Sequence, residues 1–351
     1  MMDLNITDIR KFENMVHMAD RCTIVTHTKP DGDAIGSSIA MYCFLKASGK
    51  TDVKIVIPDP YPGNLRFMIP EEVSADMITY EADPEAAVSA LKGSDLMICL
   101  DFNAFHRTDR MEKALEESVV EKILIDHHLH PDKDRFSLVF SETEISSASE
   151  LLYQILVRTS PIGGDAGNLP AEAAAALMTG MTTDTNNFAN STYPSTLNMA
   201  SDLLSAGVDR DMIIYELYNR QRENRLRLLG HALADLMKIT EDGVAYIVLD
   251  AETLKRHDIR EGETEGFVNM PLTVDDVRMS LLLKEDGDRV RVSIRSKKGT
   301  SANLCARLYF NGGGHENAAG GRLYLGKDLK DISEAGAYIE RYTHKFLTEE
   351  K

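Results

Sequence analysis

The first half of the chain alternates short apolar segments with segments of helical periodicity, and this alternation restricts the fold more than any other feature. The apolar segments are rich in β-branched residues and occupy positions 22–26, 53–57, 96–100 and 122–125. A helical pattern at 34–47 follows the first of them, after a Pro-Asp-Gly turn. Continuous apolar strands separated by helices are typical of a parallel sheet that is covered on both faces. We therefore predict an α/β fold that binds ligands outside the carboxyl ends of its strands.

The rest of the chain is first helical and then mixed. Helical patterns occupy 147–158, 170–180, 194–206 and 210–218, and a longer one covers 221–238. Strand-like runs then occupy 244–249, 278–283 and 290–294, followed by a helical pattern at 302–309 and a glycine-rich segment at 311–321. The 351 residues suffice for two hydrophobic cores. We expect one domain at 1–220, a linker helix at 221–238 and a smaller α/β domain at 239–351.

Composition narrows the class of protein. The formal charge of −17 argues against indiscriminate binding to long nucleic acids, because a phosphate backbone requires a broad basic surface. A small anionic substrate remains compatible with this charge. The four cysteines are scattered without CxxC spacing, no apolar run approaches a membrane span of roughly 20 residues, and the first residues resemble no signal peptide. These features predict a cytoplasmic protein that does not enter a membrane.

One apolar run ends abruptly at an acid and two histidines. It reads Lys-Ile-Leu-Ile and is followed directly by Asp126, His127 and His128. A buried strand is a rigid support, and the residues at its carboxyl end face the crevice where ligands bind. Asp and His together suit transition metals of intermediate hardness. The triplet therefore indicates a metal site at the end of this strand.

Three other segments carry similar side chains at comparable places. His27, Asp31 and Asp33 follow the first strand, Asp101 closes the strand at 96–100, and Asp184 follows an Ala-rich helix. A single Asp at a strand end is more often a helix cap or a turn former, and a single His is more often a hydrogen-bonded structural residue. Four such segments at one edge of a parallel sheet are difficult to explain by capping alone.

Charge repulsion supports the same interpretation. Five carboxylates would crowd this edge of the sheet: Asp31, Asp33, Asp101, Asp126 and Asp184. Such crowding raises the pKa of each group unless cations compensate it. A mixed carboxylate and imidazole set suits Mn²⁺ better than the all-oxygen shells of Mg²⁺ or Ca²⁺. Two metal ions roughly 3.5–4 Å apart are a recurring arrangement for the hydrolysis of phosphate esters.

The ordered set of these motifs resembles the DHH phosphoesterase superfamily, whose name comes from the Asp-His-His triplet. The run Gly-Gly-Gly-His-x-x-Ala-Ala-Gly-Gly at 312–321 is similar to the signature of its DHH-associated C-terminal domain. The resemblance covers nearly the whole chain, and the compact length is most similar to the RecJ-like nanoRNase and pAp phosphatase branch. It implies a catalytic metal-binding domain at 1–220 and a substrate-binding domain at 239–351.

The resemblance also implies roles for the motif residues. One metal ion would be held by His27, Asp31 and Asp101. The second would be held by Asp33, Asp101, His127 and Asp184, so that Asp101 bridges the two ions.

The resemblance implies further roles within the triplet. Asp126 would orient His127 through the second ring nitrogen of that histidine, and His128 would face the phosphate. Asp101, Asp126 and His128 are therefore the expected catalytic residues.

In the second domain, the resemblance points to phosphate contacts. Arg295 and His315 are the expected phosphate ligands, and Gly312, Gly313 and Gly314 would shape a loop whose backbone N–H groups approach an anion. A tight helix-to-strand turn also explains the glycines, and the basic residues at 289–298 are equally compatible with a solvated strand and turn. Asn187 and Asn190, after Asp184, are candidates for contacts to ribose or base.

The implied activity is a manganese-dependent hydrolysis of very short RNA to 5′-mononucleotides, together with removal of the 3′-phosphate from 3′-phosphoadenosine 5′-phosphate (pAp). Two Mn²⁺ ions per site are expected, with Mg²⁺ or Co²⁺ as substitutes, and a homodimer is one option for the assembly. The alternatives are a linear or cyclic dinucleotide phosphodiesterase, an exopolyphosphatase or pyrophosphatase, and a binding protein without catalysis. Asp101-Phe-Asn and Asp184-Thr-Asn-Asn-Phe depart from the common family pattern near the substrate, which leaves the preferred chain length open.

Overall fold

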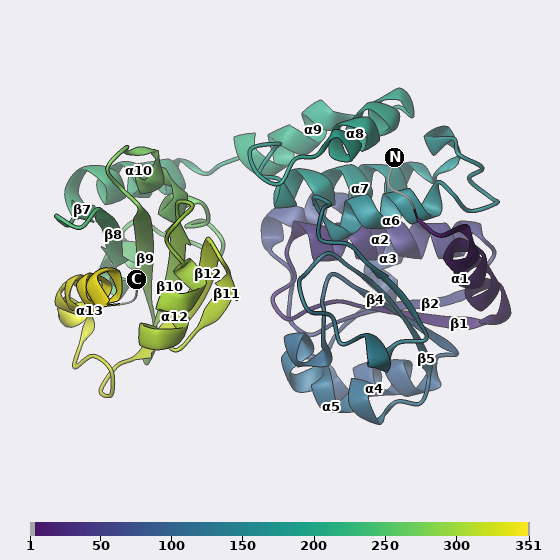
Figure 1. Ribbon diagram of the computed structural model, residues 1–351, viewed down its shortest axis with the longest axis horizontal. Helices are drawn as coiled ribbons and strands as arrows, with labels where there is room; N and C mark the ends of the chain where they lie inside the picture. Colours follow the sequence, from purple (N-terminus) through teal and green to yellow (C-terminus); the bar gives the residue numbers. More distant parts are fainter. Residues whose placement is uncertain (1–3, 350–351) are drawn as a thin grey trace. The chain divides into compact units, whose positions relative to one another are not determined.

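The computed structural model describes residues 4–349, except for the side chain of His315. The chain forms two compact units, Met1–Arg220 and Gln221–Lys351. Each unit is built around its own six-stranded sheet (Figure 1). The predicted fold class, α/β with two domains, is confirmed.

The sheet of the first unit is parallel throughout and has the strand order β3-β2-β1-β4-β5-β6. Its strands are β1 (Arg21–Val25), β2 (Asp52–Ile57), β3 (Met77–Thr79), β4 (Leu96–Leu100), β5 (Glu121–Asp126) and β6 (Leu138–Ser141). The four central strands were predicted, because both of their faces are buried. The edge strands β3 and β6 were not predicted, because they are short and only partly buried, and so lack a continuous apolar run.

The strand order creates a topological switch point beside β1. From β1 the chain proceeds to β2 and β3 on one side, then crosses to β4 on the other side of β1. Connections that leave in opposite directions open a crevice above the carboxyl ends of the two central strands. The residues that follow β1 and β4 therefore lie at the place where open α/β sheets bind their ligands.

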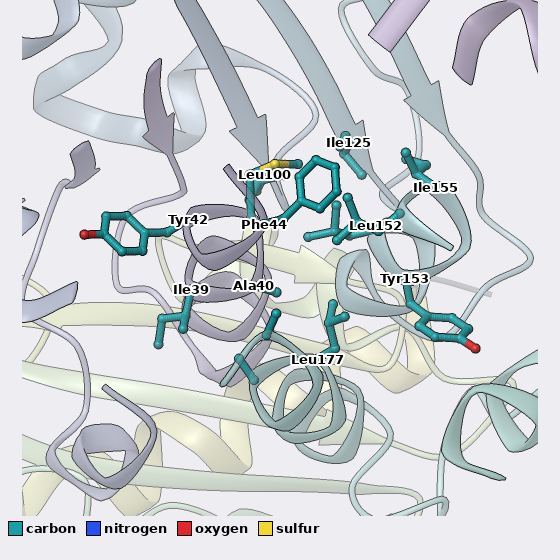
Figure 2. Packing of buried hydrophobic residues seen from close by; sticks show 14 of the residues in the cluster. Ile39, Ala40, Tyr42, Phe44, Leu100, Ile125, Leu152, Tyr153, Ile155 and Leu177 are labelled. Atoms are coloured by element: carbon teal, nitrogen blue, oxygen red, sulfur yellow. The ribbon is translucent and has the colours of Figure 1, made fainter. Parts of the chain in front are cut away.

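Helices cover both faces of this sheet (Figure 1). One face carries α1 (Ile6–Met18), α2 (Gly32–Ala47), α6 (Ala148–Leu156) and α7 (Ala171–Asp184), with α8 (Pro194–Ser205) and α9 (Arg210–Ile214) beyond them. The other face carries α4 (Pro84–Gly93) and α5 (Glu112–Glu117), and α3 (Glu71–Asp76) precedes the edge strand β3. Ile39, Leu100, Ile125, Leu152 and Leu177 meet in the larger core between sheet and helices (Figure 2).

The helix predicted at 170–180 continues to Asp184, so Gly180 does not end it. This glycine is required by close packing instead. A Cβ atom at Gly180 would lie 2.1 Å from Oγ of Ser149, and one at Gly36 would lie 2.6 Å from the carbonyl oxygen of Ala176. The two glycines thus allow α2, α6 and α7 to approach one another closely. Asp184 is consequently the last residue of a buried helix rather than part of a loop.

The second unit has a mixed sheet of order β11-β12-β10-β9-β8-β7, in which only β8 and β9 are paired in parallel. Its strands are β7 (Lys238–Ile239), β8 (Val244–Leu249), β9 (Met279–Asp286), β10 (Arg289–Ser296), β11 (Gly313–His315) and β12 (Ala318–Tyr324). α12 (Ala302–Tyr309) and α13 (Ala335–Glu349) pack on one face. The other face packs against α10 (Glu223–His231) and the 3₁₀-helix Phe267–Thr273, and α11 (Ala251–Arg256) follows β8.

The segment expected as a linker helix is helical over most of its length. α10 continues as a π-helical turn at Ala232–Leu236, and β7 begins two residues later. Leu228 and Ala232 are fully buried against Ile247 and Phe267. The helix is therefore part of the core of the second unit.

Within the described range, no helix combines the length and the apolar character that a membrane span requires.

Candidate metal centre

The predicted acidic and histidine residues of the first unit come together at the carboxyl ends of its central strands. His27 follows β1, Asp101 follows β4 and His127 follows β5, while Asp184 ends α7. These residues form three overlapping groups, and the ligand atoms within each group lie within 4.8 Å of one another. The groups are His27, Asp31 and Asp101; Asp33, His127 and Asp184; and Asp101, His127 and His128.

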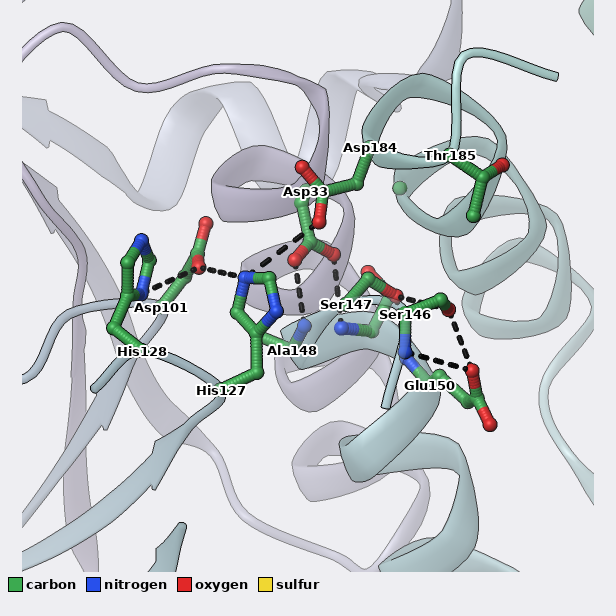
Figure 3. Close-up of polar contacts among 12 residues, drawn as sticks. Asp33, Asp101, His127, His128, Ser146, Ser147, Ala148, Glu150, Asp184 and Thr185 are labelled. Atoms are coloured by element: carbon green, nitrogen blue, oxygen red, sulfur yellow. Dashed lines mark hydrogen bonds and ion pairs between the residues drawn. The ribbon is translucent and has the colours of Figure 1, made fainter. Parts of the chain in front are cut away.

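Asp101 lies between His27 and His127 and uses one carboxylate oxygen toward each. Its Oδ2 is 3.3 Å from Nε2 of His27. Its Oδ1 is 3.4 Å from Nε2 of His127 and 3.7 Å from Nδ1 of His128 (Figure 3). The residue is buried and has a left-handed backbone, with φ of 63°. Such a conformation is unfavourable for most residues but tolerated by Asp, and it is a frequent feature of functional sites. It turns the chain sharply at the end of β4.

His27 and Asp31 are fixed by local hydrogen bonds. Nδ1 of His27 lies 2.8 Å from the carbonyl oxygen of Thr28, so this nitrogen donates and Nε2 is left for a ligand. Asp31 is the N-cap of α2 and accepts hydrogen bonds from the backbone N–H groups of Asp33 and Ala34 at 3.0 and 3.1 Å. Its Oδ1 is 4.0 Å from Nε2 of His27.

Asp33 is held differently, by another helix. Its carboxylate accepts hydrogen bonds from the backbone N–H groups of Ala148 at 2.6 Å and Ser149 at 2.8 Å, in the first turn of α6. Asp33 is almost completely buried. In the same group, Nε2 of His127 lies 3.5 Å from Oδ2 of Asp184. Three separate segments therefore supply this set of ligand atoms.

Asp126 contacts His128 rather than His127, which differs from the expected role. Its Oδ1 is 2.7 Å from Nδ1 of His128, and its Oδ2 accepts the backbone N–H of His128 at 3.1 Å. The cause is the tight turn after β5, which returns the backbone of His128 over the buried carboxylate. Asp126 thus fixes the ring of His128 through Nδ1, and Nε2 of that ring faces away from the Asp126 carboxylate.

The charges of this cluster are strongly coupled. Burial raises the pKa of Asp33 well above its usual value, and the neighbouring Asp101 and Asp184 raise it further. Burial likewise raises the pKa of Asp184 to about 7, although His127 opposes the shift. Burial would lower the pKa of both histidines, but hydrogen bonding and charge attraction by Asp101 raise it to about 9 for His27 and about 10 for His127. Nearby positive charge is therefore needed to keep these buried carboxyl groups ionised at neutral pH.

Divalent cations fit this donor set. Oδ1 of Asp101 is buried and has no hydrogen-bond partner in the described part of the chain, although it faces the ring of His127. An unpaired buried carboxylate oxygen is costly unless a cation or donor completes it. Imidazole nitrogens and carboxylate oxygens are together the usual ligands of first-row transition metals. The residues that would hold such ions are those of the first two groups.

Arg107 is a site residue that no motif in the sequence indicates. It lies in the 3₁₀-helix Phe105–Met111 after β4, and its Nη2 is 3.5 Å from Nε2 of His128. Its carbonyl oxygen accepts the backbone N–H of Thr28 at 2.8 Å, which ties it to the loop that carries His27. Because this segment has no regular periodicity, only the folded structure reveals that a guanidinium group stands beside the triplet.

Asn187 and Asn190 are exposed and lie in an unusual turn after Asp184. Asn186, Asn187 and Phe188 all have positive φ, at 46°, 58° and 67°. The side-chain oxygen of Asn187 accepts a hydrogen bond from Arg210, whose guanidinium group also lies 5.5 Å from the centre of the Phe188 ring. The left-handed backbone of Asn186 is a conformation that Asn tolerates and that glycine adopts without strain. Asn187 therefore has a structural partner within the first unit.

In the second unit, Arg295 is half-buried on β10. Its Nη1 donates to the carbonyl oxygen of Ile294 at 3.0 Å, and no carboxylate of the described residues forms an ion pair with it. Burial lowers the pKa of its guanidinium group below the usual value, but the group remains charged at neutral pH. By contrast, Arg291 on the same strand is paired with Asp286 and Glu261.

The glycine-rich segment is a hairpin of β11 and β12 rather than an open loop. A Cβ atom at Gly312 would lie 1.9 Å from the carbonyl oxygen of Gly320, and Gly314 has φ of 152°. The N–H of Gly312 donates to the carbonyl oxygen of Ala306, and that of Gly314 donates to Oδ1 of Asn303. These two N–H groups are thus occupied, which differs from the expectation that they approach an anion. Close strand packing accounts for both glycines.

His315 is the last residue of β11, and its side chain lies outside the described part of the structure. The backbone register is defined, however. Ala318 on β12 pairs with His315 on one side and with Arg295 on the other. The two expected phosphate ligands are therefore separated by a single strand.

Known protein families match both units. The DHH family, N-terminal domain, matches residues 21–181, and the DHHA1 domain matches residues 241–341. The chain is 31% identical to the bifunctional oligoribonuclease and PAP phosphatase NrnA of Thermus thermophilus, over 95% of both chains. It is 26% identical to the protein of the same name from Bacillus subtilis, over 88% of this chain and 91% of that one.

A solved structure agrees with this assignment. An exopolyphosphatase-related protein from Bacteroides fragilis is 36% identical, and the alignment covers 99% of this chain and 98% of that one, with a TM-score of 0.90. Both the sequence relatives and this structure span the two units. The chain therefore belongs to the DHH family of phosphoesterases and carries a C-terminal DHHA1 domain.

Proposed function

We propose that this phosphoesterase is a manganese-dependent enzyme that hydrolyses very short RNA oligonucleotides to 5′-mononucleotides and removes the 3′-phosphate of pAp. The observation that carries the proposal is the position of Asp101, whose two carboxylate oxygens face His27 and His127 separately. A carboxylate shared in this way suits two adjacent cations. Two-metal sites are a recurring device for in-line displacement at phosphorus.

Both substrates present the same bond to this site. In a ribodinucleotide and in pAp, a water oxygen adds to phosphorus and the bond from phosphorus to the ribose 3′-oxygen breaks. The 3′-oxygen leaves and takes up a proton. In the dinucleotide the phosphate remains on the 5′-oxygen of the second nucleoside, and from pAp it is released as inorganic phosphate. One site can therefore perform both reactions if it binds an anion next to a 3′-linked phosphate. The names of the NrnA relatives support this pair of activities.

Different side chains of the first unit would bind the metal ions and the phosphate. Two divalent cations, when bound, would activate the water and neutralise charge on the phosphoryl oxygens. His27, Asp31 and Asp101 would hold one ion. Asp33, His127 and Asp184 would hold the other, together with Asp101, which lies next to His127. His128, held by Asp126 through Nδ1, presents Nε2 beside Arg107, where the two can bind a phosphoryl oxygen or the departing 3′-oxygen.

The second unit would select the substrate. Arg295 is a charged group without a carboxylate partner among the described residues, and a guanidinium group binds phosphate oxygens in pairs. We propose that Arg295 and His315 bind a phosphate other than the one being cleaved. A requirement for this second phosphate favours pAp and oligonucleotides of very few residues.

Manganese is the proposed ion because the donor set mixes imidazole with carboxylate. Mg²⁺ and Ca²⁺ prefer all-oxygen shells, whereas first-row transition metals accept imidazole nitrogen. Mg²⁺ or Co²⁺ would then act as weaker substitutes.

A side-by-side assay tests the proposal. Purified protein with Mn²⁺ is incubated with a ribodinucleotide, a long RNA, pAp, cyclic di-AMP and polyphosphate, and products are separated by chromatography. We expect mononucleotides from the dinucleotide, AMP and phosphate from pAp, and slow or no cleavage of the long RNA. A chelator should abolish both activities, and added Mn²⁺ should restore them.

The other substrates identify the competing functions. Preferred release of phosphate from polyphosphate would favour the exopolyphosphatase alternative, and preferred cleavage of cyclic di-AMP would favour the cyclic dinucleotide alternative. Mn²⁺ binding without turnover of any of these substrates would contradict the proposal.

A further inference from the structure

We propose that Glu150 is a positioning residue for the second metal ion, because it connects the helical turn that holds Asp33 with the helix that follows Asp184 in the chain. This inference rests on the proposed two-metal function. Glu150 is completely buried in the first turn of α6 and is not itself within any of the three groups of ligand atoms. Its carboxylate nevertheless forms hydrogen bonds to two different segments of the unit.

The position of Asp33 depends on the first turn of α6. Its carboxylate accepts hydrogen bonds from the backbone N–H groups of Ala148 and Ser149. Backbone donors move only if the chain moves. A shift of this helical turn would therefore rotate the carboxylate of Asp33 away from His127 and Asp184.

Glu150 fixes the chain immediately before that turn (Figure 3). Its Oε2 accepts the backbone N–H of Ser146 at 3.2 Å and the hydroxyl of Ser146 at 2.5 Å. Ser147, the N-cap, separately accepts the N–H of Glu150 through Oγ at 2.9 Å. An ordinary capping box would bond the Glu side chain to the N-cap N–H. Here the side chain instead reaches one residue further back.

The same oxygen of Glu150 also binds a second helix. The hydroxyl of Thr196 in the first turn of α8 donates to Oε2 of Glu150 at 2.6 Å, and Oγ1 of Thr196 accepts the backbone N–H of Tyr193 at 3.1 Å. α8 is reached from Asp184 through the left-handed turn and the residues up to Tyr193. One carboxylate thus connects the segment that holds Asp33 with the segment that follows Asp184.

Close packing prevents the two segments from adjusting independently. A Cβ atom at Gly180 on α7 would lie 2.1 Å from Oγ of Ser149 and 3.0 Å from Oδ1 of Asp33. α6 and α7 therefore meet without free space at the metal-facing ends. If the hydrogen bonds of Glu150 are lost, the first turn of α6 should shift. This shift would change the distance between the carboxylates of Asp33 and Asp184, which would share an ion.

Thr196 offers the cleanest test, because a conservative control exists. Thr196→Val removes the hydroxyl donor but keeps the shape, whereas Thr196→Ser keeps the hydroxyl. Mn²⁺ binding to the full chain is measured by calorimetry without substrate, together with thermal unfolding in a chelator. Thr196→Val should weaken one of two bound Mn²⁺ ions roughly 10- to 100-fold, the usual effect of losing an outer-shell partner. Thr196→Ser should bind both ions nearly as wild type.

Glu150→Leu provides a second measurement. It removes the oxygen that accepts all three hydrogen bonds from Ser146 and Thr196, and we expect the same selective loss of one Mn²⁺ ion. If either variant failed to fold, the other would decide the question. Equal Mn²⁺ binding by wild type and Thr196→Val, with only a lower unfolding temperature, would assign the network to stability alone and overturn the inference.

The proposed activity fails in a different way. Wild-type protein that binds two Mn²⁺ ions but hydrolyses no phosphoester would contradict the proposed function while leaving the binding comparison decisive for Glu150. Wild-type protein that binds no Mn²⁺ would overturn both.

Discussion

The candidate site of the first unit and that of the second unit are held in place by different means. In the first unit, side chains from distant segments converge, and some of them are fixed by hydrogen bonds to backbone groups, as His27 is by Thr28 and Asp33 is by Ala148. In the second unit, sheet register fixes the positions of Arg295 and Ala318, and glycines allow the neighbouring strands to approach. Among the residues that the structure describes, the guanidinium group of Arg295 has only a carbonyl partner.

This difference suits two different tasks. Buried ligands with fixed partners have little freedom to rearrange, which is what a metal centre with a defined spacing requires. A charged side chain without a carboxylate partner can bind an anion without first breaking an ion pair. The first unit is therefore equipped for the chemical step, and the second is equipped to recognise a phosphate.

The largest expected effect is that of Asp101→Asn, which removes the negative charge that lies between His27 and His127. We expect hydrolysis of a ribodinucleotide to fall by more than roughly 100-fold, the upper range for loss of an outer-shell partner, because Asp101 would contact both ions directly. Calorimetry should also show weaker binding of both Mn²⁺ ions. Asp95→Asn, the same change at the opposite end of the sheet, is the control. If Asp101→Asn retained activity and Mn²⁺ binding, the proposal that the first unit performs the chemical step would be wrong.

Arg295→Ala should distinguish substrate binding by the second unit from Mn²⁺ binding by the first unit. Charge-assisted hydrogen bonds contribute about 1.5–3 kcal/mol, so we expect the KM for pAp to rise roughly 10- to 100-fold. Mn²⁺ binding should not change, because the second unit supplies none of the proposed ligands. Arg291→Ala is the matched control, since that side chain is already paired with Asp286 and Glu261. Loss of Mn²⁺ binding in Arg295→Ala would break the division between the two units.

The smallest expected effect is that of Arg210→Ala, which tests whether the turn after Asp184 belongs to the metal centre. The variant loses the cation–π contact with Phe188 and the hydrogen bond to Asn187. An exposed cation–π contact contributes about 0.5–1 kcal/mol, so activity should fall by less than roughly tenfold. Arg220→Ala, which removes an exposed ion pair with Glu216, should leave activity unchanged. A loss as large as that of Asp101→Asn would show that the turn controls the position of Asp184.

Much of this arrangement could be predicted from the sequence, because its signals are local. The four central strands have continuous apolar runs, and Asp101 and His127 follow two of them directly. Parallel strands bring their carboxyl ends to one edge, which is sufficient to expect a cluster there. The end of α7 was misplaced because Gly180 marks a close contact between helices, and local sequence does not distinguish such a glycine from one that ends a helix.

Other features depend on three-dimensional neighbours and could not be predicted. Asp126 was expected to orient His127, but the direction of the turn after β5 determines that it binds His128. Arg107 and Glu150 carry no motif, and their roles follow only from contacts with His128 and Thr196. The N–H groups of Gly312 and Gly314 were expected to approach an anion, but they are used within the second unit.

The neighbouring positions of β1 and β4 also constrain how the protein folds. Oγ1 of Thr26 donates to the carbonyl oxygen of Leu100, and these two strand ends are 74 residues apart in the chain. Contacts of such long range form slowly, because a large loop must close before they contribute stability. We therefore expect the pairing that brings His27 next to Asp101 to form late in folding, so that an unfolded or partly folded chain would present no preassembled site. Occupancy by Mn²⁺ would then report completed folding of the first unit, and the ion would stabilise that state without guiding the chain toward it.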